Sequence, residues 1–250
     1  DGTRIAFAAS RGRDHDLDWQ FDVFVVEVAT GTVTRVTDGR GCVFFAPTWL
    51  PDGTTLAVLG HRYPRGGGSR NDLWLFAADG SDARPGGGRN LSGRHDLMVG
   101  SGMGSDVVPA EATRLSVTPD GRHVLFTAPI RGSYELWRIA LDDGAVERLT
   151  EERHYVSGWA AVPTSGGARV AAIRSSFTAL PDLHVLDLAA DGAVAAGAVL
   201  RRLTSFNDGL QAEVQLRAAD ERWEEVDGRP IQGWLVRSAA AERGEVAPLV

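Results

Sequence analysis

Two short clusters of side chains are best suited to bind a ligand. They are His61-Arg62-Tyr63 and Arg94-His95-Asp96. Either arginine could pair bidentately with a carboxylate, and the histidines and the aspartate could add hydrogen bonds to the same ligand. The competing interpretation is that both clusters are loop-stabilising ion pairs, and the sequence favours it.

A metal site is not expected. Asp14, Asp16 and Asp18 alternate like the opening of a calcium-binding loop, but Trp19 stands where a glycine must turn and Val25 where a bidentate glutamate belongs. A solvated acidic loop fits better. Since Cys42 is the only cysteine, neither an intrachain disulfide nor a thiolate zinc site can form. A reducing compartment, and so a cytoplasmic location, is the simpler expectation.

No catalytic residue and no cofactor are expected in these 250 residues. A serine hydrolase nucleophile needs Gly at positions −2 and +2, and no serine here has both. Ser69 comes nearest, with Gly67 before it but Asn71 after it. The segment 100–104, Gly-Ser-Gly-Met-Gly, has the wrong register and is interpreted as a loop.

Composition excludes other classes of function. The chain has no lysine, which a P-loop requires, and its net charge of −7 with no basic stripe argues against nucleic-acid binding. No apolar run approaches the ~20 residues of a membrane span. The first residue is not Met and already lies inside a repeat, so we expect a piece of a longer protein.

The elements that position the two clusters follow from a unit that recurs four times: an acid, an apolar residue, a ring, any residue and a second apolar residue. The copies are Asp22-Val23-Phe24-Val25-Val26, Asp72-Leu73-Trp74-Leu75-Phe76, Glu135-Leu136-Trp137-Arg138-Ile139 and Asp182-Leu183-His184-Val185-Leu186. Each copy precedes a turn and then a strand that ends in a hydroxyl residue, Thr37, Ser92, Thr150 or Thr204. His184 is therefore expected in the core, at the position of the other rings.

The acids lie 50, 63 and 47 residues apart, which is the size of a four-stranded propeller blade with loop insertions. The 30 glycines fall mostly at turns between short alternating segments. The sequence therefore predicts an all-β fold, with four blades of a partial β-propeller over residues 1–206. Tight turns gather at one face, and connections 9–21, 60–71, 93–113, 128–134 and 174–181 are expected at the other, where binding usually resides.

Residues 207–250 break this pattern. Asp227-Gly228-Arg229-Pro230-Ile231-Gln232-Gly233-Trp234-Leu235 predicts a hairpin and a strand, and Ala247-Pro248-Leu249-Val250 ends within another strand. This run resembles the junction between propeller and catalytic domain in the prolyl-oligopeptidase family of serine peptidases, nearest to its acylaminoacyl-peptidase and dipeptidyl-peptidase branch. The repeats resemble the propeller of that family and equally the TolB type.

The resemblance implies that residues 207–250 lead into an α/β-hydrolase domain absent from this chain, which would hold a Ser-His-Asp triad. The propeller would then gate and orient short or N-blocked peptides, and the clusters at residues 61–62 and 94–96 would contact a peptide or the hydrolase domain. Self-association is left open. One alternative is a non-enzymatic TolB-like propeller that acts as an interaction scaffold; a closed four-bladed sugar-binding propeller is less favoured, because the first blade starts inside the repeat.

Overall fold

The fold is built from antiparallel sheets, as the repeats predict. The computed structural model describes residues 2–11, 17, 20–39, 41–63, 68–100, 114–150, 153–214 and 216–237. Asp14, Asp16, Asp18 and the segments 101–113 and 247–250 lie outside these ranges, so the interpretations placed on them are not tested. Within the described residues the one α-helix is α1 (Asp208–Val214), so the all-β prediction for residues 1–206 is confirmed there.

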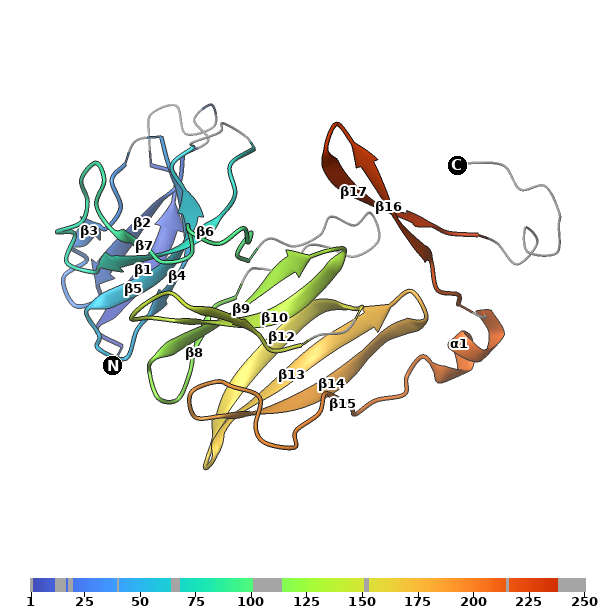
Figure 1. The fold of residues 1–250 in the computed structure, drawn as a ribbon. Coiled ribbons are helices and arrows are strands. Elements are labelled where there is room, and N and C mark those ends of the chain that lie inside the picture. The colour runs from blue at the N-terminus through green and yellow to red at the C-terminus, as the bar shows by residue number, and fades with distance from the viewer. Residues whose placement is uncertain are drawn as a thin grey trace.

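Each repeat forms one blade (Figure 1). The strands of the first two blades are β1 (Arg4–Ala9), β2 (Asp22–Glu27) and β3 (Val33–Arg35), then β4 (Val43–Trp49), β5 (Thr55–His61), β6 (Asp72–Ala77) and β7 (Arg89–Asn90). Those of the next two are β8 (Ser116–Val117), β9 (His123–Ile130), β10 (Ser133–Ala140) and β11 (Val146–Arg148), then β12 (Tyr155–Thr164), β13 (Gly167–Ser176), β14 (Ala179–Ala189) and β15 (Arg201–Arg202). In the second, third and fourth blades the repeat acid lies on the third of four strands, whereas in the first, three-stranded blade Asp22 lies on the second. None of the described sheets closes on itself.

Neighbouring blades are joined at the residue before each repeat acid. The carbonyl of Phe21 accepts a hydrogen bond from the Phe44 amide at 2.9 Å, and that of Asn71 accepts one from Val99 at 3.0 Å. In the third blade the Tyr134 amide donates to the His154 carbonyl at 3.0 Å, which joins β10 to β12 in parallel. The repeat therefore fixes both the blade and its contact with the chain that enters the next one.

The predicted ring positions are buried between blades. Trp74 is 9% exposed and packs with residues of the first and second blades, whereas Trp137 is 8% exposed and packs with residues of the second and third. His184 is likewise buried. Aromatic rings at equivalent positions thus fill the successive spaces between sheets, where removing large apolar surfaces from water stabilises the stack.

The long connections meet at one end of the blades. Arg70 donates to the Gly93 carbonyl at 2.6 Å, so the connections 60–71 and 93–100 lie together. At the other end, Arg4 reaches the Gly53 carbonyl in the Asp52-Gly53 hairpin. Connections 128–134 and 174–181 are shorter than expected, because β9–β10 and β13–β14 are closed by only Arg131-Gly132 and Phe177-Thr178.

Candidate functional site

A cavity of about 510 Å³ lies where the C-terminal hairpin meets the third and fourth blades. The hairpin consists of β16 (Asp220–Val226) and β17 (Arg229–Leu235), which lie beyond the ends of β9 and β10 in Figure 1. The side chains around the cavity that matter most for binding are Arg131, Arg153, Tyr155, Phe177, Glu221 and Trp234. This volume falls within the range of small-ligand sites.

The hairpin forms as its sequence predicts. Asp227 and Gly228 have φ values of 51° and 72°, the left-handed pair that a two-residue turn between twisted strands requires. The hairpin packs against the third blade through Trp234, whose ring lies over Gly132. A Cβ atom at Gly132 would be 2.1 Å from Trp234 Cζ2, and Gly132 itself has φ of 73°. Glycine is therefore required there both for the turn and for the ring.

Glu221 is the polar centre of this contact. Its carboxylate accepts hydrogen bonds from Trp223 Nε1 at 2.8 Å and from Gln232 Nε2 at 2.9 Å, and it pairs with Arg153 at 2.6 Å. These contacts lower the pKa of Glu221, chiefly the hydrogen bond from Trp223. Gln232 also donates to the Arg131 carbonyl at 3.1 Å, which ties the hairpin to the blade.

A buried pair of a histidine and a glutamate lies at the wall of the cavity. His154 Nε2 is 3.2 Å from Glu135 Oε2, and their side chains are 0% and 1% exposed. The hydroxyl of Thr150 donates to the same Glu135 oxygen at 2.5 Å. His154 is therefore buried, although it lies in the connection that leads into β12. Glu135 is the one repeat acid that is not aspartate, and its extra methylene extends its reach toward His154.

The side chains of His61 and Arg62 are engaged within the first two blades. The guanidinium of Arg62 lies 4.4 Å over the Trp74 ring, and its Nε donates to Asp38 at 2.9 Å. The His61 ring lies edge-on to Tyr63 with a centroid distance of 4.6 Å. Burial lowers the pKa of His61. These contacts match the stabilising interpretation of this cluster.

The residues of the second cluster, Arg94-His95-Asp96, contact different parts of the structure. Asp96 pairs with Arg70 at 3.3 Å, and Arg94 Nε donates to His95 Nε2 at 3.2 Å. His95 also lies 2.7 Å from the carbonyl of Gly144, in a turn of the next blade. None of the five predicted residues borders the 510 Å³ cavity. Contact of His61, Arg62, Arg94, His95 or Asp96 with a peptide or a neighbouring domain stays a prediction.

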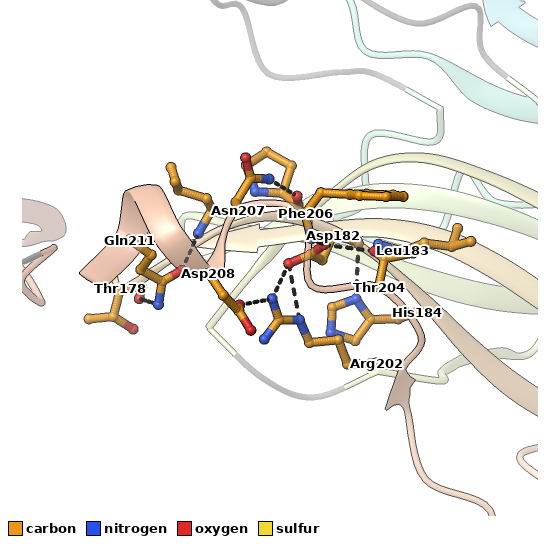
Figure 2. Close-up of polar contacts among 12 residues, drawn as sticks. Thr178, Asp182, Leu183, His184, Arg202, Thr204, Phe206, Asn207, Asp208 and Gln211 are labelled. Carbon is orange, nitrogen blue, oxygen red and sulfur yellow. Dashed lines mark hydrogen bonds and ion pairs between the residues drawn. The ribbon is translucent and has the colours of Figure 1, made fainter. Parts of the chain in front are cut away.

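A polar network leads from the fourth blade to helix α1 (Figure 2). Asp182 accepts hydrogen bonds from Thr204 at 2.7 Å and from the Phe206 amide at 3.3 Å, and it pairs with Arg202. The hydrogen bond from Thr204 is the main reason why the pKa of Asp182 is lowered. Arg202 in turn pairs with Asp208 at the start of α1.

Helix α1 is held by side-chain hydrogen bonds, because it has no buried residue. Gln211 donates to the Thr178 carbonyl at 3.0 Å and accepts from the Leu180 amide at 3.1 Å. Thr178 also borders the cavity. The turn that closes β13–β14 therefore borders the cavity and also binds helix α1, which precedes the hairpin.

Sequence reasoning did not find the cavity residues, because they come from turns of different blades and from the tail. Arg131 and Phe177 lie on turns that were expected to be longer loops. Trp234 was singled out only as part of the hairpin. Among the described residues no group of three or more His, Cys, Asp or Glu side chains could hold a metal ion. This part of the chain also contains no helix of the length and apolarity needed to traverse a bilayer.

The fold is a β-propeller, and comparisons place it near the propeller regions of known peptidases. No family model matches the chain. Among curated proteins it is similar to dipeptidyl-peptidase 5 of Porphyromonas gingivalis, with 21% identity over 257 aligned residues that cover 100% of this chain and 33% of that protein.

Solved structures give the same result for the fold. The chain is similar to Pyrococcus horikoshii acylaminoacyl peptidase, with a TM-score of 0.59, 16% identity, and 93% of this chain covering 31% of that one. It is also similar to the β-propeller domain of the trilobed protease from Pyrococcus furiosus, with a TM-score of 0.51, 18% identity and coverages of 82% and 53%. The chain thus spans about a third of the curated relative and of the acylaminoacyl peptidase.

Proposed function

We propose that these 250 residues are the propeller portion of a serine peptidase of the prolyl-oligopeptidase family. The carrying observation is the packing of the β16–β17 hairpin on the third blade, through Trp234 over Gly132 and Gln232 on the Arg131 carbonyl. The resemblance to the prolyl-oligopeptidase family implies that this hairpin is the first part of the α/β-hydrolase domain. The similarity to peptidase propellers supports the same assignment.

The propeller contributes size selection and orientation. A cavity of about 510 Å³ admits a few residues of an extended chain and excludes a folded protein. The triad and the oxyanion donors belong to the hydrolase domain that follows, because they must lie within hydrogen-bonding reach of one another and no serine here has the nucleophile pattern. The partners we propose are that hydrolase domain and short or N-blocked peptides. The location we propose for the protein is the cytoplasm.

The experiment compares purified residues 1–250 with the longer protein that contains them. Both are assayed with short peptide and N-acyl-aminoacyl chromogenic substrates, with and without a serine-directed phosphonate. We expect turnover and phosphonate labelling in the longer protein alone. Turnover by the 250 residues would contradict the domain assignment.

The second candidate is an interaction scaffold without enzymatic activity. The repeats favour it as well as they favour a peptidase propeller, and the hairpin distinguishes the two. An inert longer protein that the phosphonate does not label would support the scaffold.

A further inference from the structure

The cavity beneath the hairpin contains more positive than negative charge among the described residues. Arg153 pairs with Glu221 Oε2 at 2.6 Å, and Trp223 and Gln232 donate to Oε1 of the same carboxylate. Arg131 lies close enough to contribute to the lowered pKa of Glu221. Within the part of the chain that the structure describes, however, its guanidinium makes no direct hydrogen bond or ion pair. The cavity thus presents one cation available to an anionic ligand.

The cavity also has exposed aromatic walls on two different elements. Trp234 on β17 is 39% exposed and Phe177, in the β13–β14 turn, is 51% exposed. Their large apolar surfaces remain in contact with water, although both rings border the cavity. Removing such apolar surface from water is favourable, so a ligand with a large apolar group gains from lying between the two rings.

We propose that this cavity binds the carboxyl-terminal residue of a short peptide. The terminal carboxylate pairs with Arg131, and a large apolar or aromatic side chain lies between Trp234 and Phe177. This inference rests on the proposed function and specifies its substrate as peptides with a free carboxylate and a large apolar last residue. An amino terminus suits the described site less well, because the Glu221 carboxylate is already paired with Arg153 and accepts hydrogen bonds from Trp223 and Gln232.

The backbone makes Arg131 a clean position to test. Its φ is 45°, in the left-handed region that asparagine adopts readily, so Arg131→Asn removes the cation and retains the turn. The matched control is Arg122→Asn, an exposed arginine beside the Asp120-Gly121 hairpin at the opposite end of the blade. The ligands are N-acetyl-Ala-Phe and its carboxyl-terminal amide, which differ only in the charge.

Binding to the 250-residue chain is measured by isothermal titration calorimetry at pH 7. We expect the acid to bind at least tenfold more tightly than the amide, since a charge-assisted hydrogen bond is lost with the carboxylate. Arg131→Asn removes this difference, Arg122→Asn retains it, and Phe177→Ala weakens N-acetyl-Ala-Phe relative to N-acetyl-Ala-Ala. Circular dichroism confirms that each variant is folded.

Equal affinity for acid and amide, no binding of either, or unchanged selectivity in Arg131→Asn would overturn the proposal. The outcome is independent of catalysis. If the longer protein hydrolyses peptides while the chain shows no preference for the acid, the cavity assignment fails and the peptidase proposal stands. If the longer protein is inert while the chain binds the acid selectively, the peptidase proposal fails and the cavity assignment stands.

Discussion

The hydroxyl of Thr37 donates to Asp22 Oδ1 at 2.6 Å and accepts a hydrogen bond from the Val23 amide at 3.0 Å. The equivalent hydroxyls lie at 3.4, 2.5 and 2.7 Å from the repeat acids in the pairs Ser92–Asp72, Thr150–Glu135 and Thr204–Asp182. In every blade the repeat acid is thus bonded to the hydroxyl that follows the outer strand. The pair fixes the outer edge of the blade.

Thr37→Val should destabilise the protein by ~1–3 kcal/mol, because it leaves a buried carboxylate and a buried amide without this partner. Thr37 is fully buried, and Asp22 is nearly so. Thr37→Ser retains the hydroxyl and is the control. Urea denaturation measures both, and equal midpoints for Val and Ser would show that the pair does not stabilise the blade.

The two inter-blade tryptophans should respond differently to phenylalanine. Trp74 Nε1 donates to the Gly60 carbonyl at 3.0 Å, whereas Trp137 Nε1 has no hydrogen-bond partner among the residues that the structure describes. Trp74→Phe is therefore expected to cost ~1 kcal/mol more than Trp137→Phe. Replacing either with alanine should cost ~3–5 kcal/mol, because a large buried ring is lost. Thermal melting of the four variants gives these differences, and the opposite order for the phenylalanine pair would contradict the structure.

The blades were predictable because the repeat carries its own geometry. An acid, a ring two residues later and a closing hydroxyl 15 to 22 residues after the acid set the last two strands of each blade, and the Asp-Gly dipeptides set the turns. The pairing of Thr37 with Asp22 was not predicted, although both residues were recognised. Sequence spacing shows that two residues recur together, but not that their side chains meet.

The cavity was not predictable in the same way. It depends on two short turns, Arg131-Gly132 in the third blade and Phe177-Thr178 in the fourth. It also depends on a hairpin that lies about 100 residues after the first of these turns. Arg62 and His95 were predicted instead, because they are polar residues in connections that were expected to be long loops. Their partners, Trp74 and the Gly144 carbonyl, become apparent only when adjacent blades are packed.

Docking of the hairpin should weaken in acid through Glu221. The pKa of this carboxyl is lower in the folded protein than the ~4.3 of an unperturbed glutamate. Its ionised form therefore stabilises the hairpin above pH ~4.3, chiefly through Trp223 and Gln232 within the hairpin, and Arg153 adds an attraction that favours docking on the blade. Both contributions are lost as the pH falls toward and below the folded pKa. A 5-fluorotryptophan label at Trp234, assigned with Trp234→Phe, reports the change by ¹⁹F NMR between pH 6 and 3. Glu221→Gln should abolish the local pH dependence, and an identical titration in this variant would assign it to another group.

The thiol of Cys42 should be unreactive until the first two blades separate. Cys42 is fully buried, and the pKa of its thiol is raised far above the usual range by burial and then by the carboxylates of Asp22 and Asp38. Alkylation requires the thiolate, so iodoacetamide at pH 8 should label the native protein far more slowly than a cysteine peptide. Labelling then reports opening of the structure, and Thr37→Val, which weakens the adjacent Asp22 contact, should accelerate it more than Thr204→Val in the fourth blade. Mass spectrometry follows the reaction, and a native protein labelled as fast as the peptide would show that Cys42 is accessible.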